Sequence, residues 1–124
     1  MLHSFDADQK KFLQQISQDQ DELDWVQIPG YVSIAEKRVR GAITGMAGVT
    51  IRHGIIPSLF IAVAPAHRGK GIASELMTSL LSQWKGIMFL TYYRKKTHLG
   101  PFYASFGFKK IIDWPGGRVL CVRF

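Results

Sequence analysis

The chain has 124 residues, of which 47% are hydrophobic and 20% charged, so it is long enough for one domain with a buried core and too apolar to be disordered. No apolar run reaches the roughly 20 residues of a membrane span, and the N-terminus lacks the features of a secretory signal, so we expect a cytoplasmic protein without a membrane partner. The charge is uneven: residues 1–36 carry a net charge of −5 and residues 37–124 a net charge of +12, which indicates an anionic partner for the larger part.

The first quarter of the chain contains one predicted helix. Asp6 and Gln9 have the spacing of a capping box, and the apolar residues that follow recur at helical spacing, which predicts a helix near residues 7–18. The acidic segment that continues to Gly30 has no clear period, and we expect a loop or an irregular helix there.

Two antiparallel strands are expected next, over residues 31–35 and 39–51, with a polar turn at residues 36–38. The second strand contains three glycines, Gly41, Gly45 and Gly48. Glycines are unusual in a plain strand, so we expect them to mark bulges or the close approach of another part of the chain.

A strand, a glycine-rich loop and a helix then follow in succession. The apolar run Leu59–Val63 predicts a strand covered on both faces, and apolar residues at helical spacing predict a helix over residues 72–84, which Gly86 is expected to end. The basic loop between them, residues 64–71, opens the helix. Because the first N–H groups of a helix have no intrahelical partner and lie at the positive end of its dipole, we expect this loop to bind a phosphate group.

The last third of the chain alternates again between strands and helices. We expect a buried strand at residues 87–90, a short helix at 99–106, and final strands at 108–112 and 118–124. The order of strands, helix, strand, helix and strands predicts an α/β fold with a mixed sheet and helices on its faces.

Two common phosphate-binding motifs do not fit the loop. A dinucleotide-binding fingerprint needs a third Gly or Ala where Ser74 stands, and an acidic residue about 20 positions later, where this chain is basic. The loop of phosphate-binding NTPases needs Gly, four residues and then Gly-Lys-Ser/Thr, and the sequence has no such string.

Two other motifs resemble those of the GCN5-related N-acetyltransferases (GNAT). Residues Arg68 to Ala73 resemble the family's Arg/Gln-x-x-Gly-x-Gly/Ala motif, and residues Phe102 to Phe108 look like its Phe-Tyr-x-x-x-Gly-Phe motif, one strand and one helix later. The resemblance implies the GNAT fold, a splayed and mostly antiparallel sheet flanked by helices. It implies a single domain over residues 1–124, with a shortened N-terminal region at residues 1–30.

The resemblance also implies an N-acetyltransferase that uses acetyl-coenzyme A (acetyl-CoA) and transfers the acetyl group directly to a primary amine. The residues implied to bind acetyl-CoA are Ile61, Ala62 and Val63 along the pantetheine arm, then Arg68, Gly69, Lys70, Gly71, Ile72, Ala73 and Ser74 around the pyrophosphate. Tyr103 matches the family tyrosine that protonates the leaving thiolate, although a plain core tyrosine stays open. A backbone N–H near Val63 is implied to bind the thioester carbonyl.

The chain departs from the family pattern in its candidate general base. The strand before the loop has no carboxylate, so Glu36, His53, an ordered water or no base at all stay open. Lys96 stands where the family often has Asn. The basic run at residues 94–96 is either a solvated surface or a contact for the coenzyme's 3′-phosphate or for an acidic acceptor.

Other functions and sites are less favoured by the sequence. The missing carboxylate keeps a non-catalytic acyl-CoA-binding module as the alternative function. Nucleic-acid binding is disfavoured because the aromatic residues have core spacing. The histidines have no paired spacing, so we expect no metal site, and the lone Cys121 is expected in a strand. The sequence does not identify the amine acceptor or distinguish a monomer from a homodimer.

Overall fold

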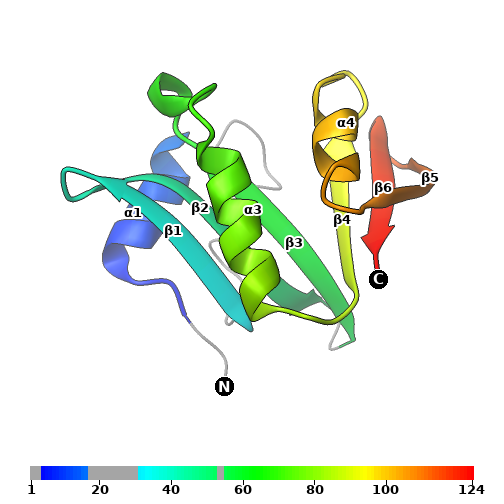
Figure 1. The fold of residues 1–124 in the computed structure, drawn as a ribbon, viewed down its shortest axis with the longest axis horizontal. Helices are drawn as coiled ribbons and strands as arrows, with labels where there is room; N and C mark the ends of the chain where they lie inside the picture. The colour runs from blue at the N-terminus through cyan, green and yellow to red at the C-terminus, as the bar shows by residue number, and fades with distance from the viewer. Residues whose placement is uncertain (1–3, 17–30, 53–54) are drawn as a thin grey trace.

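The framework of the protein is one six-stranded sheet in the order β1-β2-β3-β4-β6-β5, seen here in a computed structural model that describes residues 4–16, 31–52 and 55–124 (Figure 1). All neighbouring strands are antiparallel except β3 and β4, which are parallel. The strands are Ser33–Val39 (β1), Ala42–Arg52 (β2), Ile56–Val63 (β3), Met88–Tyr93 (β4), Lys109–Trp114 (β5) and Arg118–Arg123 (β6). The helices are Ala7–Ile16 (α1), Ile72–Gln83 (α3) and Leu99–Ala104 (α4), with a 3-10 turn at Pro65–His67 (η1). This architecture confirms the predicted mixed sheet with flanking helices.

Two clusters of buried side chains cover the two faces of the sheet. The larger cluster packs α3 and α4 against the sheet, and the smaller one packs α1 against β2 and β3. Leu59 belongs to the larger cluster and Phe60 to the smaller, because successive residues of a strand point to opposite faces. The prediction that this strand is covered on both faces is therefore confirmed. Within the described ranges, no helix is long and apolar enough to span a membrane.

Helix α1 begins with the predicted capping box. The Gln9 backbone N–H donates to Asp6 Oδ1 at 2.8 Å, and the Asp6 N–H donates to Gln9 Oε1 at 3.0 Å, so two N–H groups at the helix start gain partners. The Phe12 and Leu13 side chains are buried and form the inner face of the helix. The end of the predicted helix, residues 17–18, and the acidic segment up to Gly30 lie outside the described residues.

The hairpin between β1 and β2 corrects the predicted turn. Residues 36–38 belong to β1, and the turn is formed by Arg40 and Gly41, with φ angles of +54° and +82°, between the paired residues Val39 and Ala42. Two central residues with positive φ are the mark of the tight hairpin turn that matches the twist of a sheet. The polarity of residues 36–38 reflects the exposure of β1 at the edge of the sheet and does not mark a turn.

The other two glycines of this region are explained by close approach, as predicted. A Cβ atom at Gly45 would lie 2.9 Å from Ile72 Cγ2 and from Leu76 Cδ1, so the glycine lets α3 lie directly on β2. At Gly48 a Cβ would lie 2.6 Å from a ring carbon of Phe60.

The end of α3 corrects a second prediction. The helix ends at Gln83, and Trp84 already has extended backbone angles. Gly86 is not among the described glycines with positive φ, so it does not act as a left-handed cap. By contrast, Gly107 after α4 has φ +92°, as expected of the glycine that follows a helix.

Candidate active site

The central feature of the site is a splay of the sheet between β3 and β4. The two parallel strands share one pair, Ser58 with Phe89, and no further pair joins them. Beyond it β3 continues to Val63 and β4 to Tyr93, and Figure 1 shows the two strands diverging toward these C-terminal ends. We call the diverging parts, residues 59–63 and 90–93, the splay.

Backbone groups of β3 face the splay at alternate residues. The Ala64 N–H donates to the Thr44 carbonyl of β2 at 2.8 Å, and the ladder alternates, so the N–H and C=O groups of Ala62 also face β2. Those of Ile61 and Val63 therefore face β4, which no longer pairs with them. Of the three residues expected to contact the pantetheine arm, Ile61 and Val63 thus direct their backbone groups into the splay, whereas those of Ala62 pair with β2.

The loop that follows β3 leads directly into the start of α3. Gly69 has φ +77°, and Gly71, the residue before the helix, has φ +80°. Residues other than glycine rarely adopt this backbone conformation. No atom of the described residues lies within 4 Å of the position that a Cβ would take at either glycine, so a ligand can approach this backbone. None of their side chains caps the helix, which leaves the first N–H groups of α3, those of residues 72–74, open to an anion.

Charged side chains surround this helix start. Arg68 and Lys70 are exposed on the loop, and Arg68 Nε donates to the Val63 carbonyl at 3.1 Å, which ties the loop to the end of β3. Glu75, in the first turn of α3, forms an ion pair with Lys37 Nζ of β1 at 3.0 Å. This pair offsets a carboxylate that would otherwise repel an anion at the helix start, although both side chains are exposed and the energy is small.

Of the predicted contact residues at the helix start, Ile72 is buried, Ala73 is half-buried and Ser74 is exposed. The Ile72 side chain belongs to the larger core, so only its backbone can reach a ligand. The Ser74 carbonyl accepts a hydrogen bond from Thr78 Oγ1 at 2.9 Å, and the Ser74 side chain faces solvent.

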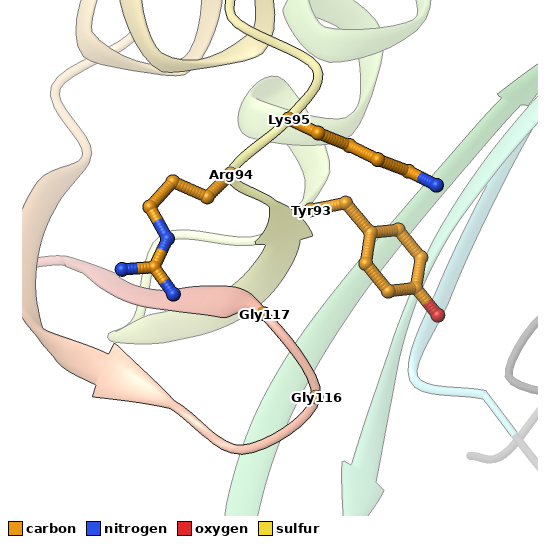
Figure 2. A pocket seen from close by; sticks show the side chains of 5 residues that line it. All are labelled: Tyr93, Arg94, Lys95, Gly116 and Gly117. Carbon is orange, nitrogen blue, oxygen red and sulfur yellow. The ribbon is translucent and has the colours of Figure 1, made fainter.

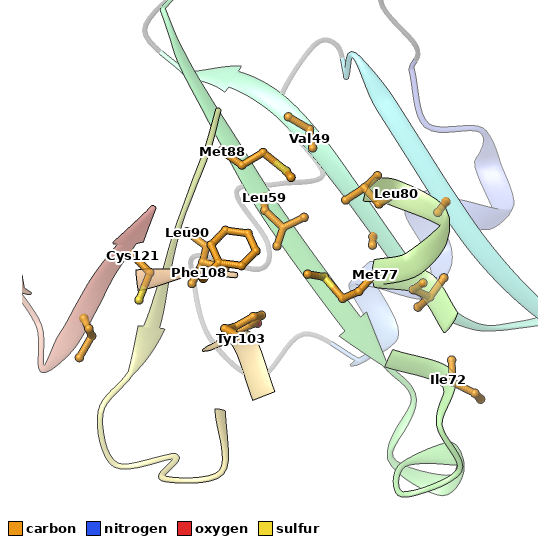
Figure 3. Close-up of a cluster of buried hydrophobic side chains, with 14 residues drawn as sticks. Val49, Leu59, Ile72, Met77, Leu80, Met88, Leu90, Tyr103, Phe108 and Cys121 are labelled. Atoms are coloured by element: carbon orange, nitrogen blue, oxygen red, sulfur yellow. The ribbon is translucent and has the colours of Figure 1, made fainter. Parts of the chain in front are cut away.

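Tyr103 lies on α4, within the larger core. Its ring packs against Phe108, with centroids 6.0 Å apart, and against Tyr92 of β4, at 5.8 Å; Figure 3 shows it next to Phe108, with Met77 of α3 on the other side of the cluster. Burial, with smaller contributions from Cys121 and Tyr92, raises the pKa of this phenol far above its usual range. The phenol is therefore protonated at neutral pH and can serve only as a hydrogen-bond or proton donor to an anionic neighbour.

Comparison with known proteins identifies the family. A family model described as the acetyltransferase (GNAT) domain matches residues 29–110, more than half of the chain. The chain belongs to the GNAT acetyltransferase family. No curated protein matches it.

Solved structures of several acetyltransferases have the same fold. A GNAT-family acetyltransferase of Staphylococcus aureus has a TM-score of 0.73 at 16% identity, covering 99% of this chain and 97% of that one. The ribosomal-protein-S18-alanine N-acetyltransferase of Escherichia coli has a TM-score of 0.73 at 15% identity, covering 99% and 92%. YncA of Salmonella typhimurium, solved with its cofactor acetyl-CoA, has a TM-score of 0.69 at 16% identity, covering 98% and 90%. At such identities the likeness concerns the fold alone.

The described candidate base of this GNAT protein, Glu36, does not lie at the splay. Glu36 is on β1, two strands from β3, and its carboxylate accepts hydrogen bonds from Gln9 Nε2 at 2.8 Å and from Arg38 Nε. His53 lies outside the described residues. Neither β3 nor β4 contains a carboxylate.

Sequence reasoning missed two residues that shape the GNAT site. The sequence predicts Lys37 in a turn, so it gives no indication that this residue lies beside α3 and pairs with Glu75. Tyr92 packs against the Tyr103 ring. It lies two residues after the buried Leu90 and therefore on the same face of β4, and this spacing was the signal in the sequence for its orientation.

Proposed function

We propose that the chain is an enzyme that transfers the acetyl group of acetyl-CoA to a primary amine by direct attack. The observation that carries this proposal is the position of the splay, because β3 runs from it directly into the loop that opens α3. Strand and helix start thus offer backbone N–H groups in one continuous path. The GNAT family uses acetyl-CoA, whose pantetheine amides and pyrophosphate match these two kinds of donor.

In the proposed complex, the backbone groups of Ile61 pair with an amide of the pantetheine arm, as a neighbouring strand would. The Val63 carbonyl already accepts from Arg68 Nε, and the Val63 N–H remains for the thioester carbonyl. The pyrophosphate lies over Gly69 and Gly71 and accepts hydrogen bonds from the first N–H groups of α3. Arg68 and Lys70 add positive charge. The open space above both glycines supports this fit, since no described atom lies within 4 Å of either Cβ position.

The proposed reaction forms one C–N bond and breaks one C–S bond. The neutral amine attacks the thioester carbonyl, and the Val63 N–H stabilises the developing oxyanion. The electron pair of the broken bond moves to sulfur, and Tyr103 donates its proton to the thiolate. We assign the removal of the amine proton to water, because the strands of the splay contain no carboxylate.

The donor site is tested by ligand-induced stabilisation. Acetyl-CoA at one hundred times its Kd should stabilise the folded protein by about 2.7 kcal/mol, which raises Tm by about 10 °C for a chain of this length. Arg68→Glu should abolish the shift, because it places a negative charge beside the pyrophosphate. Arg40→Glu, the same change at the exposed β1–β2 turn, should retain it. An unchanged shift in Arg68→Glu contradicts the donor site.

Catalysis is tested by incubating the protein with acetyl-CoA and a panel of amines while the released thiol is titrated. The proposal expects release above background hydrolysis with at least one amine and a lower kcat in Tyr103→Phe. The lack of a carboxylate on β3 and β4 favours a second candidate, a non-catalytic acyl-CoA-binding module. If acetyl-CoA stabilises the protein and no amine is acetylated, that candidate replaces the enzyme.

A further inference from the structure

A hollow lies at the C-terminal end of β4, beside the turn between β5 and β6. Its volume is about 440 Å³, and it is lined by Tyr93, Arg94, Lys95, Gly116 and Gly117. Figure 2 shows the side chains of Tyr93 and Lys95 extending together toward the first half of the sheet, and Arg94 pointing the other way, over β6. A hollow of this size accommodates a small molecule or a few residues of a peptide.

The hollow lies on the opposite face of β4 from Tyr103. Tyr92 packs against Tyr103, and successive side chains of a strand point to opposite faces, so Tyr93 points away from α4. Both residues lie at the end of β4 that diverges from β3. A molecule in the hollow therefore reaches the splay from the face opposite to the proposed donor proton.

The part of the chain that forms the hollow is strongly positive. Residues 85–124 contain eight Lys and Arg and a single carboxylate, Asp113. Asp113 is already engaged by Lys110 Nζ at 3.0 Å and by Arg94 Nη1 at 3.5 Å. Among the described residues, Lys95 and Lys96 have no carboxylate partner, so their charge is available to an anion.

The lysines are held beside the hollow by an aromatic ring. The Nζ atoms of Lys95 and Lys96 each lie 5.8 Å from the centroid of the Tyr93 ring, within the range of a cation–π contact. On the opposite side the Arg94 N–H donates to the Gly117 carbonyl at 2.9 Å, which fixes the glycine turn. No described atom lies within 4 Å of the position that a Cβ would take at Gly117, so the Gly117 side of the hollow leaves room for a ligand.

We propose that this hollow binds an anionic group of the acceptor, so that the substrate is a primary amine that also carries a carboxylate or a phosphate. The inference rests on the proposed acetyl transfer and adds the chemical class of the acceptor. Lys95 and Lys96 bind the anion, and the amine extends from it into the splay. The anion belongs to a small amine or to an acidic peptide, and the two sources are separated below.

The first experiment measures anion binding without any reaction. The ¹⁵N-labelled protein is titrated with glutarate and with inorganic phosphate, and we expect saturable shifts of the Gly116 and Gly117 amide signals that are lost in Lys95→Glu. Lys85→Glu, the same charge change at the other end of β4, should retain them. Shifts that do not saturate, or that persist in Lys95→Glu, overturn the inference. If coenzyme A moves the same signals and its dephospho form does not, the hollow holds the 3′-phosphate, which also overturns it.

The second experiment compares matched amines as acceptors. One pair is O-phosphoethanolamine and ethanolamine, and the other is the peptides Ala-Glu-Glu and Ala-Gln-Gln, so the pairs separate a small substrate from a peptide. In at least one pair we expect kcat/KM to be about tenfold higher for the anionic member, as charge-assisted hydrogen bonds allow. Lys95→Glu should reduce that ratio to about one, and Lys85→Glu should retain it.

The two proposals fail in different ways. Equal kcat/KM values within both pairs overturn the inferred substrate class and leave acetyl transfer intact. If no amine is acetylated, the proposed function fails, and the titration with glutarate and phosphate alone decides whether the hollow binds anions.

Discussion

Replacing Gly71 by alanine tests whether the conformation of the loop, and not only its charge, is needed to bind acetyl-CoA. Gly71 has φ +80°, and a Cβ there would have no atom within 4 Å, so the added methyl group causes no clash. The effect comes from the left-handed backbone alone, which destabilises an alanine by about 1–2 kcal/mol. For a chain of this length, Tm should fall by about 4–8 °C. A backbone that relieves the strain turns the N–H groups of the helix start away from the pyrophosphate, so Kd for acetyl-CoA should rise by about tenfold.

Gly41 provides a matched control. It has φ +82° and no atom within 4 Å of a Cβ, and it lies in the β1–β2 turn, away from the splay. Gly41→Ala should lower Tm by a similar amount and leave Kd unchanged, as measured by scanning and titration calorimetry. Gly71→Asn should fall between glycine and alanine, because asparagine tolerates positive φ better. The reasoning is refuted if Gly71→Ala lowers Tm and binds acetyl-CoA as tightly as Gly41→Ala does.

Two further predictions concern the core around the site. The folded protein keeps the Tyr103 phenol protonated, whereas the unfolded chain ionises it above about pH 10, so this group's contribution is complete below pH 10 and then falls by about 1.4 kcal/mol per pH unit. Urea unfolding from pH 8 to 11 should show this loss in the wild type relative to Tyr103→Phe, and parallel curves would contradict it. Gly45→Ala places a Cβ 2.9 Å from two side chains of α3, so it should destabilise the protein by about 1–3 kcal/mol. A free energy of unfolding equal to the wild type's would show that α3 shifts without penalty.

Features that depend on neighbours in the chain could be predicted from the sequence. The capping box at Asp6 and Gln9, the buried strand before the loop and the left-handed Gly107 each follow from a local pattern, and each is present. The hairpin turn was misplaced because residues 36–38 are polar, and polarity reports exposure on an edge strand as well as a turn. The turn lies at Arg40 and Gly41, where φ is positive, and an arginine in the sequence does not indicate a positive φ.

The candidate site could be predicted only in part, because the splay depends on pairing between distant strands. Gly69 and Gly71 indicated an anion-binding helix start from local chemistry alone. The divergence of β3 and β4 came only from the family resemblance, since nothing in the periodicity shows that pairing stops after Ser58 and Phe89. The sequence does not show which of residues 61–63 direct their backbone groups into the splay, because the parity of the β2–β3 ladder cannot be derived from composition.

The structure shows which cations the carboxylates of the basic part of the chain can offset. The only two in residues 37–124 are Glu75 and Asp113, and each lies 3.0 Å from a lysine Nζ. Asp113 also pairs with Arg94, so within the described residues Lys70, Lys95 and Lys96 have no carboxylate partner. Under the proposed function, one set of cations follows β3 and binds the pyrophosphate, and the other follows β4 and binds the acceptor. A positive surrounding lowers the pKa of an ammonium group. Because Lys95 and Lys96 carry two positive charges, one bound carboxylate leaves a net positive charge beside the acceptor amine, which then reaches its reactive neutral form more easily. This reduces the need for a carboxylate base, which neither β3 nor β4 contains.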